Sequence, residues 1–215
     1  MAKKEVPLHA LSAYLPQGAL EPVLEYLHRY HIHLTITRER NTLLGDYRHA
    51  VAHKNHRISV NGNLNKYAFL ITLLHEIAHL LTYEQHGGRV APHGNEWKQA
   101  YSRLLATFLL KKIFPADVEK ALLHSVRNPS ASTCSEEQLM RVLKRYDNRK
   151  PGQVLVEELE EGELFRTHDG RIFRKGEKLR KRHKGVEVQT GAVYVFSAVY
   201  EVYRLAADGI SGGGR

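Results

Sequence analysis

Residues 65–86 read NKYAFLITLLHEIAHLLTYEQH, a long helical pattern that Gly87 and Gly88 end. Apolar residues cover most sides of this helix, which is typical of a helix buried in a core. The polar residues fall on one stripe at intervals of three and four: Thr72, His75, Glu76, His79, Thr82, Tyr83 and His86. An unpaired buried polar group costs about 1–3 kcal/mol, so the stripe needs partners.

The centre of this helix carries the motif His-Glu-x-x-His at residues 75–79. Four residues are about one helical turn, so the imidazoles of His75 and His79 project from one face and can bind one metal ion. Glu76 lies beside them, within reach of a water on that ion. In the competing interpretation the two histidines bond to backbone groups in the core and Glu76 lies at the solvent edge. The hidden polar stripe favours the metal site.

A catalytic zinc site usually has three protein ligands and one position open to water. We expect His93 to be the third ligand, because it follows the Gly87-Gly88 stop and precedes the next helix, where a loop can fold back over the ion. Two alternatives stay open at this point. His86 continues the helical stripe but is two turns from His79, and Glu96 would give a site of two histidines and one glutamate.

The motif around residues 75–79, followed by His93-Gly94-x-x-Trp97-Lys98, resembles the pattern of the SprT-like family of zinc metalloproteases over about residues 10–112. The resemblance implies a zincin-like fold, Zn²⁺ held by His75, His79 and His93, and Glu76 as the catalytic acid and base. It also implies a link to DNA and to cleavage of DNA-bound proteins. Many members carry a four-cysteine zinc ribbon, whereas this chain has a single cysteine, Cys134. A ribbon-like region here must therefore fold without zinc.

The rest of the sequence predicts an α+β protein: a first domain with a small β-sheet, a zincin-like metalloprotease domain as the resemblance implies, and a small all-β module after it. Helical spacing covers 20–30, 95–109, 115–126 and 135–146, and short alternating stretches at 32–36 and 57–60 predict strands. Beyond Gly152 the period changes to two, and Asp169-Gly170 and Thr190-Gly191 predict hairpin turns. We therefore predict a protease domain at 1–128, a helical linker at 129–152, a basic β-rich module at 153–206 and a disordered tail at 207–215.

Basic side chains gather in the predicted β-rich module between residues 166 and 184. Phosphate contacts from such a run, with aromatic residues between, would bind nucleic acid. The residues that we expect to contribute are Arg171, Arg174, Lys175, Arg180, Lys181, Arg182 and Lys184. Two other interpretations stay open: the run pairs with the acidic block at 157–163, or it is an ordinary solvated face.

Composition limits the remaining possibilities for this chain of 215 residues. A net charge of +9 favours anionic partners such as DNA, and one cysteine excludes a disulfide scaffold and fits a reducing cytoplasm. We expect no membrane span, because the most apolar segment carries His75, Glu76 and His79.

The function predicted from the sequence is that of a zinc metalloprotease in which Glu76 assists the attack of a zinc-bound water on a peptide bond of a protein or peptide substrate. Tyr47, Tyr83 and His86 are candidates for stabilising the oxyanion. The alternative is a nucleic-acid-binding protein with a structural or vestigial zinc site.

Overall fold

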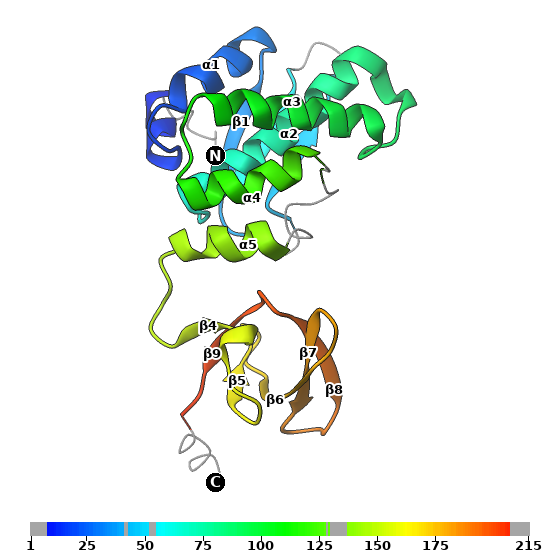
Figure 1. Cartoon of the computed structure of the whole chain (residues 1–215). Coiled ribbons are helices and arrows are strands. Elements are labelled where there is room, and N and C mark those ends of the chain that lie inside the picture. The colour runs from blue at the N-terminus through cyan, green and yellow to red at the C-terminus, as the bar shows by residue number, and fades with distance from the viewer. Residues whose placement is uncertain (1–7, 41–42, 52–54, 128, 130–136, 207–215) are drawn as a thin grey trace, which may run out of the picture. The chain divides into compact units, whose positions relative to one another are not determined.

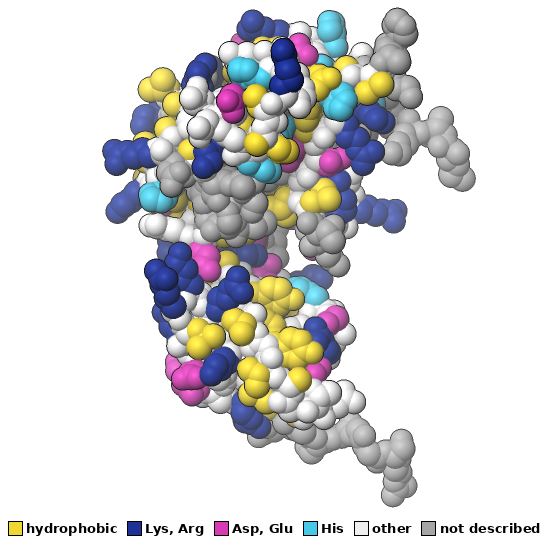
Figure 2. Space-filling view, turned by 90° about the vertical axis from the view of Figure 1, so that its right-hand side faces the viewer, with side chains coloured by type: hydrophobic (Ala, Val, Ile, Leu, Met, Phe, Trp, Pro, Cys, Tyr) yellow, Lys and Arg dark blue, Asp and Glu magenta, His cyan; other side chains and the backbone are white. Residues whose placement is uncertain are grey.

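The computed structural model describes residues 8–40, 43–51, 55–127, 129 and 137–206. The chain divides into two compact units, residues 1–147 and 148–215, and each is described by itself (Figure 1). Helices and strands are both present, in agreement with the predicted α+β class. Lysine and arginine side chains lie at many separate places on the face that Figure 2 shows.

Helix α2, Lys66–His86, is the centre of the first unit, and it confirms the helix predicted from the sequence. The Asn65 side chain accepts hydrogen bonds from the backbone N–H groups of Tyr67 at 3.1 Å and Ala68 at 3.0 Å, which caps the helix. The helix ends at Gly87, whose φ of +63° favours glycine. Thirteen of its residues are buried, so the helix runs through the core as its all-round apolar character predicts.

A three-stranded sheet packs against α2 in the order β1-β3-β2. Strands β1, His33–Thr37, and β3, Arg57–Asn61, run parallel and correspond to the two predicted strands. The edge strand β2, Gly45–Arg48, is antiparallel to β3 and was not predicted. Its four residues, Gly-Asp-Tyr-Arg, have no apolar alternation, and the strand gains its stability from β3 and α2 rather than from its own sequence.

The other helices of the first unit close the core around α2. They are α1 (Leu20–Arg29), α3 (Asn95–Leu110), α4 (Ala116–Arg127) and α5 (Glu137–Leu143), with short 3₁₀ turns η1 (Leu8–Tyr14), η2 (Gly87–Arg89) and η4 (Lys144–Tyr146). None of the described helices combines the length and apolar character that a membrane-spanning segment requires.

Helix α5 corrects the predicted linker at 129–152. Leu139 and Leu143 are buried in the same hydrophobic cluster as α2, α3 and α4. In addition, the Asn65 side chain donates to the Leu143 carbonyl at 2.9 Å and to the Asp147 carboxylate at 2.6 Å. The helix is therefore part of the first unit, because its apolar face completes that core.

The second unit is a six-stranded antiparallel sheet in the order β4-β9-β5-β6-β7-β8. The elements are β4 (Gln153–Leu155), η5 (Val156–Glu158), β5 (Leu164–Arg166), β6 (Ile172–Lys178), β7 (Arg182–Glu187), β8 (Val193–Ser197) and β9 (Glu201–Arg204). The predicted turns at Gly170 and Gly191 join β5 to β6 and β7 to β8, with φ of +91° and +73°. Val156, Leu159, Phe165, Phe173 and Val202 form a small hydrophobic core in this unit, whose sequence contains no cysteine. The predicted tail at 207–215 lies outside the described residues.

Candidate metal centre

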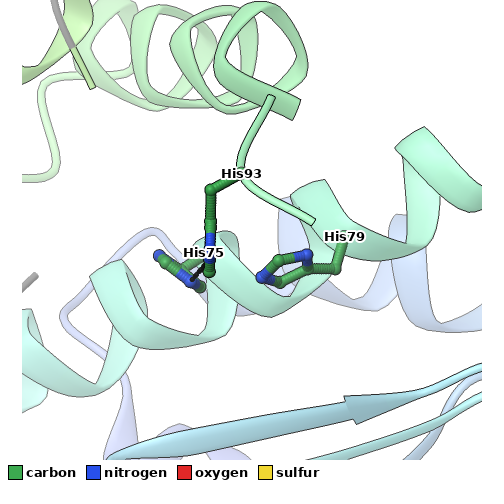
Figure 3. A group of neighbouring side chains, drawn as sticks. All are labelled: His75, His79 and His93. Atoms are coloured by element: carbon green, nitrogen blue, oxygen red, sulfur yellow. Dashed lines mark hydrogen bonds between the residues drawn. The ribbon is translucent and has the colours of Figure 1, made fainter. Parts of the chain in front are cut away.

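Three histidine side chains meet above α2 (Figure 3). His75 and His79 project from consecutive turns of the helix, and His93 reaches down from the loop before α3. Their ligand nitrogens all lie within 4.8 Å of one another, and the two Nε2 atoms of His75 and His93 are 3.3 Å apart. The structure therefore brings together the three residues that the sequence analysis proposed as ligands.

A glycine and a tight turn in the loop between α2 and α3 bring His93 back over α2. Gly87 allows the chain to leave α2 in a left-handed conformation, and η2 follows immediately. The Gly94 N–H then donates to the Ala91 carbonyl at 3.0 Å, and the Gly94 carbonyl accepts the N–H of Lys98 to begin α3. His93 is therefore held between a turn and a helix start, which limits its freedom.

The donor set fits a zinc ion. Two nitrogens bound to one tetrahedral zinc, each about 2.0–2.1 Å from it, are about 3.3–3.4 Å apart, close to the separation of the Nε2 atoms of His75 and His93. Among the described residues, the rival ligands His86 and Glu96 do not belong to this group of mutually close donors. Three imidazoles leave one vertex of a tetrahedron for water or substrate.

The histidines are held in the neutral form that binds metal. Burial, together with the neighbouring imidazoles, lowers the pKa of His75 to about 3 and that of His79 to about 4. Burial also lowers the pKa of His93. Because a metal binds the neutral form of an imidazole, these lowered pKa values favour metal binding.

Trp97, the third residue of α3, packs against all three rings. Its ring centroid lies 4.7 Å from that of His75, 5.3 Å from that of His79 and 4.7 Å from that of His93. The side chain is completely buried, and among the described residues its indole N–H has no hydrogen-bond partner. Trp97 therefore acts by shape, as an apolar wall that restricts the rotation of the three imidazoles.

Glu76 is buried beside the edge strand of the sheet. Only 6% of the residue is exposed, and a Cβ added to Gly45 of β2 would lie 2.6 Å from its Oε1 atom. Burial is the main cause that raises the pKa of Glu76 to about 8; Asp46 raises it further and Arg40 opposes the change. Because Gly45 has no side chain, the Glu76 carboxyl group can pack against β2 at this position.

A hydrogen-bonded chain on the β2 side of the site was missed by the sequence analysis. The Tyr47 hydroxyl donates to His56 Nδ1 at 2.9 Å, and the Ala50 N–H donates to the same nitrogen at 3.3 Å. His56 Nε2 therefore carries the ring proton and faces Glu84 Oε1 at 3.3 Å. No local pattern marks His56 and Glu84, because β3 and α2 bring them together from positions 28 residues apart.

The three candidates for the oxyanion donor lie in different surroundings. The Tyr47 ring is parallel to that of His79, with centroids 6.4 Å apart, and burial is the main cause that raises its pKa, so the phenol stays protonated. Tyr83 stacks on His49 with centroids 4.5 Å apart. His86 is at the last turn of α2. Tyr47 is the candidate whose ring packs beside a metal-site histidine.

The structure splits the seven predicted nucleic-acid-binding residues into two groups. Four of them are engaged within the second unit: Arg171 pairs with Asp169 at 2.8 Å, Arg174 donates to the Gly162 carbonyl at 3.2 Å, Lys184 pairs with Glu177 at 2.6 Å and Lys175 donates to the Leu159 carbonyl. Lys175 is 7% exposed, which corrects its assignment to a phosphate-binding surface.

Arg180, Lys181 and Arg182 form the second group, at the turn between β6 and β7. They are exposed and have no acidic partner among the residues that the structure describes. Two acidic side chains of the block at 157–163 pair with arginines outside the predicted run, Glu158 with Arg149 at 2.7 Å and Glu163 with Arg204 at 3.4 Å, whereas Lys175 and Arg174 of the run reach backbone carbonyls of this block.

Fold and site together describe an α+β protein in which two histidines of a buried helix and one of the following loop could hold a metal ion. Residues 19–120 match the model of the SprT-like family. Protein SprT of Proteus mirabilis (strain HI4320) is 28% identical over 156 residues, which are 68% of this chain and 78% of that protein. Residues 19–120 therefore form a SprT-like domain. No solved structure matches it significantly.

Proposed function

We propose that the protein is a zinc-dependent metallopeptidase of the SprT-like type, with a zincin-like first unit. The observation that carries the proposal is the convergence of the ring nitrogens of His75, His79 and His93 within 4.8 Å, with Glu76 next to the first of them on the same buried helix. A structural zinc site would have all four positions filled by protein groups, whereas this group offers three.

The residues of the chain divide the work of peptide hydrolysis. His75, His79 and His93 would hold a zinc ion, which would supply Lewis acidity at the site. The carboxylate form of Glu76 accepts a proton from the attacking water and then donates it to the departing amine, so that the peptide C–N bond breaks with no net change of charge on the enzyme. Trp97 excludes water from the far side of the imidazoles and holds their orientation. The Tyr47 hydroxyl, beside His79, is the candidate donor to the oxyanion.

His93→Ala tests the proposed ligand set directly. The substitution removes one of three nitrogens, and we expect zinc affinity to fall by more than about 100-fold, since loss of an outer partner of a ligand alone costs 10–100-fold. Zinc affinity is measured by competition with a chromogenic chelator, and cleavage of an unfolded protein substrate is followed in parallel. His86→Ala is the matched control from the same polar stripe, and it should keep both properties. Equal zinc affinity in His93→Ala and wild type would rule out the site.

DNA binding by the second unit is the second candidate function, and with it the cleavage of DNA-associated proteins. It is supported by Arg180, Lys181 and Arg182, which are exposed and have no acidic partner among the described residues.

Three phosphate contacts predict that the logarithm of DNA affinity falls against the logarithm of salt concentration with a slope of about −3. Replacing all three residues by alanine should flatten the slope, while Lys184→Ala should change it little because Lys184 is paired with Glu177. A fluorescence titration of duplex DNA at several salt concentrations measures the slope. Salt-independent or undetectable binding eliminates this function.

A further inference from the structure

Strand β8 forms an open edge of the second sheet. Among the described strands it pairs only with β7, and its sequence Val-Tyr-Val-Phe-Ser contains no charge, proline or glycine. Natural sheets usually protect an exposed edge with charged residues, proline, bulges or a very short strand. The opposite edge, β4, follows this rule, because it is three residues long and turns directly into η5. The unprotected edge is therefore confined to β8.

The backbone of β8 presents hydrogen-bonding groups along this edge. The Glu187 N–H donates to the Ala192 carbonyl at 2.9 Å, so residues 192, 194 and 196 bond to β7. Alternation in an antiparallel ladder then turns the N–H and C=O groups of Val193 and Val195 outward. Among the described residues these groups have no partner. An added strand would therefore meet two N–H donors and two C=O acceptors at the spacing of an antiparallel ladder.

The edge strand itself carries Val193 and Val195 on one face and Tyr194 and Phe196 on the other, and Lys184, the register partner of Val195, is paired with Glu177. Val193 is 60% exposed and Val195 is 47% exposed, and the first lies opposite Val186 on β7, which is 38% exposed. On the other face Tyr194, also 38% exposed, packs its ring against Phe173 with centroids 5.3 Å apart. In Figure 2 hydrophobic side chains gather on this unit, with lysine and arginine side chains near them. A strand added here would bury apolar surface as well as backbone.

Charge distinguishes the two ends of the edge. At one end, Ser197 has Arg182 of β7 as its register partner, and Arg180 and Lys181 lie next to Arg182 at the turn between β6 and β7. At the Val193 end the nearby Arg171 is already neutralised by Asp169 at 2.8 Å. An antiparallel strand would begin at the Ser197 end, so acidic residues before its apolar core would meet the basic turn. A second copy of β8 in this arrangement would place residues 189–192, Gln-Thr-Gly-Ala, at that turn, and these carry no charge.

We propose that β8 binds an extended segment of a protein partner by adding it as an antiparallel strand, and that this segment has acidic residues followed by about five apolar residues. Such strand addition takes affinity from backbone hydrogen bonds and specificity from alternate side chains. A nucleic acid offers no ladder of alternating N–H and C=O groups to the outward groups of Val193 and Val195. The binding site is independent of the metal centre.

The test uses a fluorescein-labelled peptide with three acidic residues followed by Val-Ile-Val-Tyr-Val, and fluorescence anisotropy with the full chain. We expect saturable binding that Val195→Pro weakens at least tenfold, because proline removes the central outward N–H while leaving the ladder to β7. Val195→Thr, which keeps the N–H and the branched side chain, should bind within about threefold of wild type. A second peptide with the acidic residues after the core should bind more weakly. Mass spectrometry checks that the probe stays intact.

The proposal is overturned if the peptide does not bind, or if Val195→Pro binds it as well as wild type. It is also overturned if sedimentation shows a dimer of the chain that Val195→Pro dissociates, since the occupant is then a second copy. If Val195→Pro weakens the binding of an oligothymidine as much as it weakens the binding of the peptide, the edge is a nucleic-acid site instead. If the circular dichroism of Val195→Pro differs from that of the wild type, the test uses Val193→Lys instead, with Val193→Thr as its control. We then expect Val193→Lys to bind the peptide at least tenfold more weakly and Val193→Thr to bind it within about threefold of wild type.

Discussion

Glu76→Gln is expected to lower kcat/KM for peptide hydrolysis by about 10²–10⁴-fold, the contribution of a general acid and base, while one zinc ion still binds per chain. The amide has nearly the shape of the carboxylate but accepts no proton from water. The three ligand nitrogens are untouched, so zinc affinity should stay close to that of wild type. The fold should tolerate the change, because the amide fills the same space against Gly45 as the carboxyl group.

Zinc content by elemental analysis and cleavage of an unfolded protein substrate are measured on the same preparation of Glu76→Gln. Glu96→Gln is the matched control: it makes the same acid-to-amide change at a half-buried residue of α3 that competed with His93 in the sequence analysis. We expect Glu96→Gln to cut at a rate within about threefold of wild type. Cleavage by Glu76→Gln within tenfold of wild type would contradict the proposed role, whatever its zinc content.

The buried helix and its ligands could be predicted because their signals are local. An apolar run on all sides, a capping Asn65 and a terminating Gly87 are enough to define α2, and the spacing of His75 and His79 follows from helical geometry. The prediction of His93 as a ligand required one further assumption: the short loop between two helices folds back over the first helix. The two hairpin turns of the second unit were equally local, because glycine at positive φ is needed at both.

The parts that could not be predicted depend on partners distant in the sequence. Strand β2 exists because β3 pairs with it and α2 covers it, so its own four polar residues give no sign of it. Gly45 acquires its importance only when β2 is placed against Glu76. The basic run misled the sequence analysis for the same reason: whether Lys175 faces solvent depends on which residues the sheet packs around it, and here it reaches the Leu159 carbonyl.

Trp97 shows how far the metal centre depends on packing that no motif explains. Zinc ligation needs only nitrogens at the correct separation, yet each imidazole can rotate about two side-chain bonds. The indole touches all three rings and is itself stacked on Tyr101, with centroids 4.9 Å apart. Because the indole N–H has no hydrogen-bond partner among the described residues, its contribution is one of volume. The ring of phenylalanine should therefore fill most of the space of the indole, whereas the methyl group of alanine should not.

We accordingly expect Trp97→Ala to lower the free energy of unfolding by about 3–5 kcal/mol, the usual cost of emptying a buried aromatic site, and Trp97→Phe to lower it by less than about 1.5 kcal/mol. Unfolding by urea, followed by circular dichroism with a chelator present, separates this loss from any stabilisation by bound metal. Zinc affinity, measured separately, should fall in Trp97→Ala because three imidazoles then lose their common wall. If Trp97→Phe were as unstable as Trp97→Ala, the indole would be making a specific interaction, and the account of Trp97 as an apolar wall would be wrong.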